Sequence, residues 1–134
     1  MKILLVSTLM FFCLHAISQT ESSADTIIVN SDSVYSRFDT PPKLPKGNIE
    51  SFMEKNMTYP KDAIKKGIQG SVIVKYTVEK DGSVTNVEAE SGPMELRENA
   101  VELIKKTNKW VPAFYKGKIV RTIQRQPIVY RLTR

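Results

Sequence analysis

Few residues in this chain have the types and spacing that acid–base or metal chemistry requires. Glu88 and Glu90 stand two apart in a segment with the alternation of a β-strand, so both carboxylates would lie on one face, as a general acid and base could. The chain has one cysteine and one histidine, Cys13 and His15. Because no histidine and no evident nucleophile accompanies the two glutamates, we interpret them as solvated carboxylates without partners. We therefore predict no catalytic residue, no metal site, no cofactor and no enzyme.

Residues 1–18 have the pattern of a secretory signal peptide. One lysine precedes an apolar run from Ile3 to Ile17, and Ala16-Ile17-Ser18 forms a small-x-small cleavage pattern. The run is shorter than the roughly 20 residues that a membrane-spanning helix needs. We expect cleavage before Gln19 and a periplasmic protein; the alternatives are an uncleaved anchor in the inner membrane, facing the periplasm, and a lipoprotein acylated at Cys13.

Cleavage would remove both Cys13 and His15, and with them any thiolate or imidazole zinc site and any Ser-His or Cys-His catalysis. The composition, 41% apolar and 25% charged, is that of a foldable soluble domain.

Basic residues gather toward the C-terminus. The chain has 20 Lys and Arg against 14 Asp and Glu, and the segment from Leu103 to Arg134 has no acidic residue. This basic surface is either simply solvated or attracts an anionic partner, such as the cell envelope or an acidic protein. Export, together with the lack of a recognition helix or repeated aromatic platforms, argues against nucleic acid.

We expect residues 19–47 to form a disordered, proline-rich spacer and residues 48–134 to form one domain. Phe38 to Gly47 contains three prolines, which favour extended geometry. We interpret this stretch as a stiff lead-in, with a recognition motif as the alternative.

Three helices are expected in the domain. Asn48 caps a first helix, Asn48 to Asn56, and a second runs over Lys61 to Lys66 with Ala63 and Ile64 pointing inward. A longer helix, Pro93 to Thr107, carries an apolar stripe that would cover a sheet.

The strands are indicated by alternation and turn residues. Ser71 to Glu79 and Ser83 to Glu90 flank an Asp81-Gly82 turn and predict a β-hairpin, with an irregular step in the return strand that indicates a bulge. A final strand runs from Ile119 to Leu132, where Pro127 predicts a sheet edge or a bulge. The hairpin's inner face is formed by Val72, Val74, Tyr76 and Val78.

The order and spacing of these residues resemble the C-terminal domain of the TonB energy-transducer family, over about Asn48 to Leu132. The residues that carry the resemblance are Tyr59-Pro60, Ala63, Gly67, Gly70, the hairpin strand, Asp81-Gly82-Ser83-Val84, Ser91-Gly92, Ala100, Trp110-Val111-Pro112-Ala113, Gly117-Lys118 and Pro127-Ile128-Val129-Tyr130. The resemblance implies an α+β fold, with a three-stranded antiparallel sheet and helices packed on one face.

The resemblance also implies a function. The domain would capture the TonB box, a short peptide of an outer-membrane receptor, by strand addition, and would pass on force from inner-membrane, proton-driven motor proteins. Carried over by position, the contacts come from the segment before Tyr59 and from the final strand. They are Asn56, Met57, Thr58, Thr122, Ile123, Gln124, Arg125, Gln126, Ile128, Val129 and Tyr130. Arg121, Arg125 and Pro127 could instead serve only to protect an edge strand from self-association.

Two classes of function stay open. A family transducer has an N-terminal membrane helix with Ser-x-x-x-His, whereas this chain has Ser7 and His15 eight apart on the segment predicted to be cleaved. The first class is energy transduction for TonB-dependent transport. The second is a detached envelope-binding module, for a receptor or the cell wall, that transmits no force. The oligomeric state is also open, a homodimer included.

Overall fold

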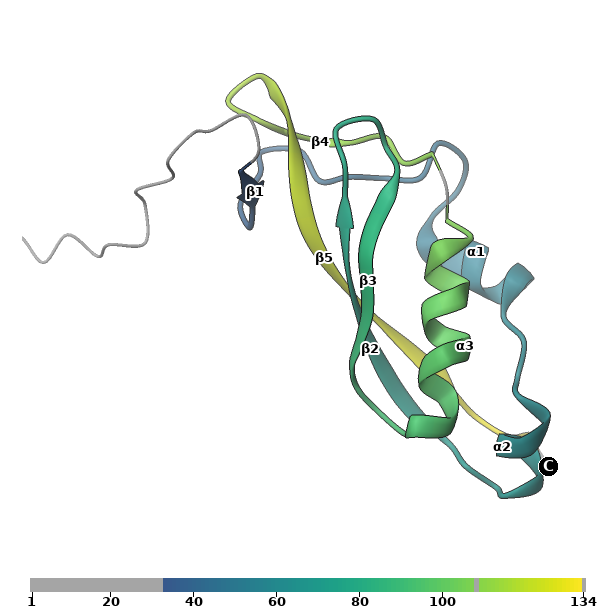
Figure 1. Ribbon diagram of the computed structural model, residues 1–134. Helices are drawn as coiled ribbons and strands as arrows, with labels where there is room; N and C mark the ends of the chain where they lie inside the picture. The colour runs from purple at the N-terminus through teal and green to yellow at the C-terminus, as the bar shows by residue number, and fades with distance from the viewer. Residues whose placement is uncertain (1–32, 108, 134) are drawn as a thin grey trace, which may run out of the picture.

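The computed structural model describes residues 33–107 and 109–133 (Figure 1). The expected signal peptide or anchor and most of the spacer, residues 1–32, lie outside the described residues. The strands are β1 (Val34–Tyr35), β2 (Gly70–Val78), β3 (Val84–Ser91), β4 (Ala113–Tyr115) and β5 (Lys118–Tyr130), and the helices are α1 (Ile49–Asn56), α2 (Lys61–Lys65) and α3 (Met94–Lys105).

The strands form one sheet in the order β1-β5-β2-β3, with β4 paired to the start of β5. β2 is antiparallel to both β3 and β5, which is the predicted three-stranded antiparallel sheet. Two short strands, β1 parallel to β5 and β4 antiparallel to it, extend this centre into a mixed sheet. The predicted α+β fold is confirmed, and the helices lie together on one side of the sheet (Figure 1).

The inner face of the sheet is the one that α3 covers. The alternating apolar residues of β2 are buried on it, as predicted, and meet the apolar stripe of α3. The buried residues from these two elements are Val72, Val74, Tyr76, Val78, Leu96, Ala100, Leu103 and Ile104. Burial of this apolar surface is the main stabilising contribution to the fold.

The turn of the hairpin is fixed against the chain that follows α3. Trp110 donates its backbone N–H to the Gly82 carbonyl at 2.8 Å, and a Cβ built on Gly82 would lie 2.0 Å from the Trp110 carbonyl oxygen. Only glycine therefore fits here. The predicted bulge is also present: the β2–β3 register shifts twice, and Asn86 in β3 has φ +50°.

The two short helices follow the prediction with one correction. The Asn48 side chain accepts the Ser51 N–H at 2.8 Å, so it caps α1 as expected. In α2, Ala63 is buried but Ile64 is 47% exposed. The prediction that Ile64 points inward is wrong, because a helix of five residues presents only one side to the domain.

The proline-rich lead-in packs on the domain together with β1, and we use the name lead-in below for residues 34–47, β1 included. Tyr35 and Leu44 are buried, and the lead-in pairs with the segment that follows α3: Thr40 bridges Phe114 of β4, and Lys43 bridges Val111 just before β4. This differs from the expectation of a spacer reaching to residue 47. The prolines lack only backbone donors, so an extended edge segment accommodates them.

Candidate binding edge of the sheet

The strand β5 has two edges with different surroundings. One edge pairs with β2 along Thr122 to Tyr130 without any register shift. The other pairs with β1 only at Arg121 and Thr122. Among the described residues, no strand pairs with this second edge from Ile123 onward. We call this stretch, residues 123–130, the open edge.

Pro127 reveals which backbone groups face the open edge. Backbone groups alternate between the two edges of a strand, and a proline has no N–H to give. Pro127 lies opposite Ile73 in the unshifted β2–β5 ladder, so its position belongs to a non-hydrogen-bonded pair whose backbone faces away from β2. The open edge is therefore formed by the N–H and C=O of Ile123, Arg125 and Val129, with the C=O alone of Pro127, which also accepts from Gln126 Nε2 at 3.2 Å.

The alternation also divides the predicted contact residues of β5 into two sets. In the first set, the side chains lie on the inner face beside the core residues of β2, and the backbone groups pair with β2. This set consists of Thr122, Gln124, Gln126, Ile128 and Tyr130. Thr122, Ile128 and Tyr130 are fully buried. Those on the outer face, Ile123, Arg125 and Val129, have partly or fully exposed side chains together with backbone groups at the open edge.

The other predicted segment, Asn56 to Thr58, lies near the end of β5. The Asn99 side chain joins the two: its Nδ2 donates to Thr58 Oγ1 at 3.0 Å, and its Oδ1 accepts from the Tyr130 hydroxyl at 2.7 Å. Burial raises the pKa of Tyr130 to about 12, so this hydroxyl stays protonated and able to donate. The Tyr59 ring packs edge-on against Tyr130 at 5.4 Å.

Within that segment, Asn56 and Met57 are also engaged with α1. The Asn56 side chain donates to the Phe52 carbonyl at 2.8 Å, and the Met57 backbone N–H donates to Met53 at the end of α1. Met57 is also packed against the core. Thr58 is exposed. Asn99 was not among the predicted contact residues; its only signal in the sequence is that it is a polar residue next to the apolar stripe of α3.

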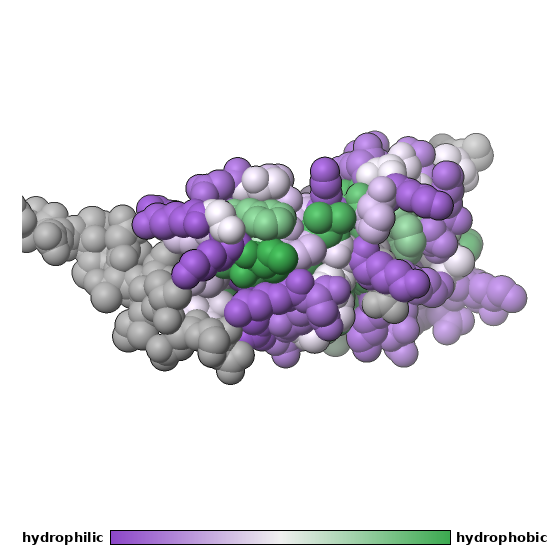
Figure 2. Space-filling model, turned by 90° about the horizontal axis from the view of Figure 1, so that it is seen from above, coloured by the Kyte–Doolittle hydropathy of each residue, from purple (hydrophilic) through white to green (hydrophobic). Residues whose placement is uncertain are grey.

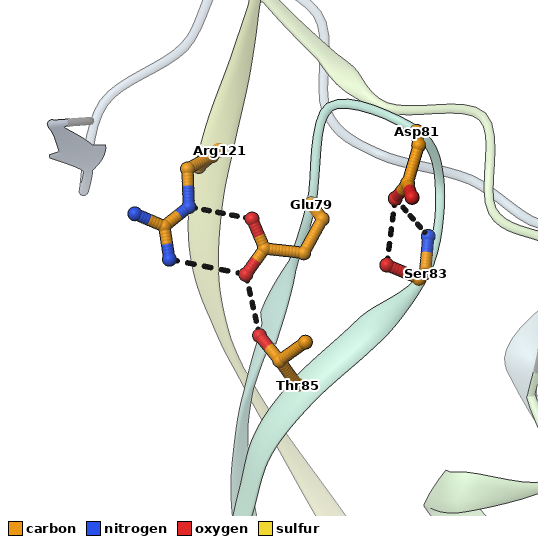
Figure 3. A network of polar contacts seen from close by, with 5 residues as sticks. All are labelled: Glu79, Asp81, Ser83, Thr85 and Arg121. Atoms are coloured by element: carbon orange, nitrogen blue, oxygen red, sulfur yellow. Dashed lines mark hydrogen bonds and ion pairs between the residues drawn. The ribbon is translucent and has the colours of Figure 1, made fainter. Parts of the chain in front are cut away.

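Two arginines tie β5 to the rest of the sheet on the outer face. Arg121 binds Glu79 with two nitrogens, and Glu79 also accepts from the Thr85 hydroxyl (Figure 3). The Arg121 guanidinium holds the pKa of Glu79 below its usual range. Both side chains of this pair are 19% exposed, so water screens it less than a surface pair. It fixes β5 where the open edge begins.

The second arginine corrects an expectation. Arg125 donates to both carboxylate oxygens of Glu90, at 2.9 and 3.1 Å, and Lys75 lies 2.7 Å from Glu88. The side chains of Glu88 and Glu90 are partly exposed to water, as predicted. The prediction that they have no partners is wrong, because both carboxylates are ion-paired. The sequence missed these pairs because the partners come from three different strands.

One further polar group lies unpaired beside the open edge. Gln124 Nε2 is buried and has no hydrogen-bond partner among the described residues. Burying an unpaired donor costs free energy that an outside acceptor would recover. In residues 33–107 and 109–133, no helix is long and apolar enough to cross a membrane. The same residues contain no group of three or more His, Cys, Asp or Glu placed to hold a metal ion.

The fold and its edge place the chain in a class: small α+β domains with an antiparallel sheet that ends in an unpaired strand edge. The family model for the Gram-negative bacterial TonB protein C-terminal region matches residues 55–132, and the chain belongs to this family. The resemblance seen in the sequence is thereby confirmed. The family is non-enzymatic, which confirms the prediction that the chain is not an enzyme, and the domain is periplasmic.

A solved structure of 28% identity agrees with the family. The chain is similar to a solution structure of the Helicobacter pylori TonB C-terminal domain, with 28% identity and a TM-score of 0.53 over 64% of this chain and 78% of that chain. A shorter version of the same domain gives 28% identity and a TM-score of 0.48 over 62% of this chain and 88% of the other. A comparison with curated proteins finds no match.

Proposed function

We propose that this domain binds the TonB-box peptide of an outer-membrane receptor by adding it as a strand to the open edge of β5, in energy transduction for TonB-dependent transport. Membership of the TonB C-terminal family supports a role in this process. One observation carries the binding mode: the backbone groups of Ile123, Arg125 and Val129 face an edge that no described strand occupies. Strand addition uses such groups for affinity and alternate side chains for specificity.

The surroundings of the open edge suit an extended peptide. Arg125 and Pro127 keep the edge from pairing with a second copy, since charge and proline disfavour edge-to-edge pairing. The half-buried side chain of Ile123 and the exposed side chain of Val129 would contact alternate residues of the peptide on the outer face. The unpaired Gln124 amide would take an acceptor on the inner face.

The test is an amide NMR titration of the full chain with a TonB-box peptide. We expect the largest changes in amide chemical shift at Ile123, Arg125 and Val129. A peptide of scrambled sequence should give no changes of this size. Shifts confined to Lys61 to Lys66 or to α3 would contradict the proposal.

A pair of modified peptides sharpens this test. An added strand turns every second N–H toward β5 and the others toward solvent. Methylating the nitrogens of one set should weaken binding by at least roughly fivefold, since one hydrogen bond is worth about 1 kcal/mol. Methylating the other set should leave binding unchanged. Equal effects from both sets would exclude strand addition.

Binding without force transmission is the second candidate function. It rests on the sequence pattern of residues 1–18, which is that of a cleaved signal peptide. The intact mass of the native protein from separated membrane and soluble envelope fractions decides between the two. A soluble chain beginning at Gln19 indicates a detached module that binds a receptor or the cell wall. A membrane-bound chain retaining residues 1–18 indicates a transducer coupled to inner-membrane motor proteins.

A further inference from the structure

We propose that the tip of the β4–β5 hairpin docks on the surface of an anionic lipid bilayer. The docking surface consists of Phe114, Lys116, Lys118 and Ile119, and we call it the hairpin tip. It lies at the start of β5, whereas the open edge lies further along the same strand, so the two surfaces can be occupied together. The inference therefore does not depend on the proposed strand addition.

The hairpin tip projects from the domain. Lys116 and Gly117 form a two-residue turn with φ +49° and +74°, as in the type I′ turns that close tight hairpins. A Cβ built on Gly117 would meet no atom within 4 Å. In Figure 1 this turn stands at the end of the molecule, away from α2 and the end of β5. A projecting tip can reach a flat surface without displacing the rest of the fold.

The hairpin tip is also held rigidly. β4 pairs with β5 on one edge and with the lead-in on the other, where Asp39 donates its N–H to the Phe114 carbonyl at 2.8 Å. The Asp39 carboxylate accepts the Lys116 backbone N–H at 2.7 Å, which fixes the turn. Behind the turn, Tyr115 packs on Tyr35 at 5.4 Å. Docking would therefore cost little conformational entropy, because the chain is already ordered at the hairpin tip.

Two large apolar side chains are exposed at this tip. Phe114 and Ile119 are 36% and 45% exposed, and they lie directly opposite each other across the hairpin, so they share a face. Val34, 39% exposed, continues this apolar area, because it pairs with Arg121 on the face that Ile119 occupies. Figure 2, which views the molecule from this end, shows apolar side chains gathered among hydrophilic ones. In water, this exposure has no benefit for the isolated fold.

The charge around the apolar pair is basic. Lys116 lies in the turn and Lys118 directly follows it; both are exposed, and neither ammonium forms an ion pair with a described carboxylate. The Asp39 carboxylate, which contacts this turn, is engaged by the Lys116 backbone N–H. The Lys116 ammonium lies 5.2 Å from the centre of the Tyr115 ring. Unlike Arg121 and Arg125, these two cations are therefore available to an outside anion.

This combination fits a lipid surface better than an acidic protein. A convex tip with Phe and Ile at its surface can insert between headgroups, while lysines on long apolar stems reach anionic phosphates beside it. An acidic protein would need a concave pocket to cover the same apolar pair. The periplasm, where this family's domain works, is bounded by membranes, so a lipid surface is always within reach.

The test uses the full chain and lipid nanodiscs that carry a gadolinium-chelating lipid. With phosphatidylglycerol in the discs, amide relaxation enhancement should be strongest at residues 114–119, and it should weaken as salt rises. The double variant Lys116→Ser, Lys118→Ser should lower the affinity about 25-fold, since each lysine near an anionic surface contributes about fivefold. Ile119→Thr, which keeps a β-branched residue in the strand, should lower it by a smaller factor.

The matched control is Lys61→Ser, Lys65→Ser. It removes the same charge from exposed positions on α2, and it should leave the enhancement at residues 114–119 unchanged. All variants contain residues 1–18, so any binding of that segment to the nanodiscs is the same in each and does not affect this comparison. The proposal fails if the enhancement peaks elsewhere, if discs of phosphatidylcholine alone give the same enhancement, or if the control variant loses as much affinity as the tip variant. Amide spectra with native dispersion verify that each variant is folded.

Discussion

Two threonines buried in this domain have opposite hydrogen-bonding environments. Thr107 donates its hydroxyl to the Ile104 carbonyl at 2.6 Å and accepts from Trp110 Nε1 at 3.0 Å. Thr122, on β5, is equally buried, but its hydroxyl has no partner among the described residues. A buried hydroxyl stabilises a fold only when it is paired. The same substitution should therefore have opposite effects at the two positions.

Thr122→Val should raise the free energy of unfolding by about 1 kcal/mol, because it removes an unpaired polar atom and keeps the shape and β-branching of the side chain. Thr107→Val should lower it by about 2 kcal/mol, because two hydrogen bonds are lost and the Trp110 N–H is left without an acceptor. Urea unfolding of both variants measures the difference. A loss of stability in both would mean that the Thr122 hydroxyl has a partner.

At the scale of elements, β5 combines two roles along its length. Its first residues are enclosed between β4 and β1, and Arg121 is held there by Glu79. From Ile123 onward only the β2 side is paired. One strand thus anchors the sheet at one end and offers a free edge at the other.

Pro127→Ala tests this assignment directly. The N–H that the alanine restores should face the open edge, so it should exchange with water much faster than the amides of Gln126 and Ile128, which the β2 ladder protects. Peptide affinity should rise roughly fivefold, since the peptide gains one hydrogen bond worth about 1 kcal/mol. Hydrogen exchange and the peptide titration measure the two effects.

The control for this prediction is Gln126→Ala, which changes the neighbouring side chain but leaves the pattern of backbone donors intact. It should not create a fast-exchanging amide within β5. If the restored N–H of residue 127 exchanged as slowly as those of Gln126 and Ile128, the assignment would be wrong. The backbone groups at the open edge would then be those of Gln124, Gln126 and Ile128.

At the scale of the whole molecule, the lead-in closes the fold. Leu44 belongs to the main core, while Tyr35 forms a second cluster with Ala113 and Val120 beneath the β4–β5 hairpin. The domain in the described residues therefore extends well before α1. The hairpin tip and the open edge are both positioned by this arrangement, because the lead-in borders β4 and the start of β5.

Leu44→Ala measures how far the lead-in contributes to stability. Removing a buried leucine side chain should lower the free energy of unfolding by about 3 kcal/mol. Lys46→Ala, an exposed position two residues later, should change it by less than about 0.5 kcal/mol. Urea unfolding compares the two. Equal, small effects would show that the lead-in is not part of the cooperative unit.

The sequence by itself predicted the elements whose signals are local. The alternation of β2, the Asp81-Gly82 turn, the Asn48 cap and the stripe of α3 each depend on neighbours within a few residues, and all of them are found in the structure. Ile64 was the exception, since a short helix has too few turns for its period to define a face.

Tertiary structure alone decided which edge of β5 is open. The sequence identified Pro127 as a sign of an edge, but which edge of β5 is open depends on β1 and β2, whose residues pair with β5 from far along the chain. The Arg121–Glu79 and Arg125–Glu90 pairs depend on the same register. Periodicity determines which face of a strand is buried, because side chains alternate along the chain itself. The partners at each edge are determined only when distant segments pack together.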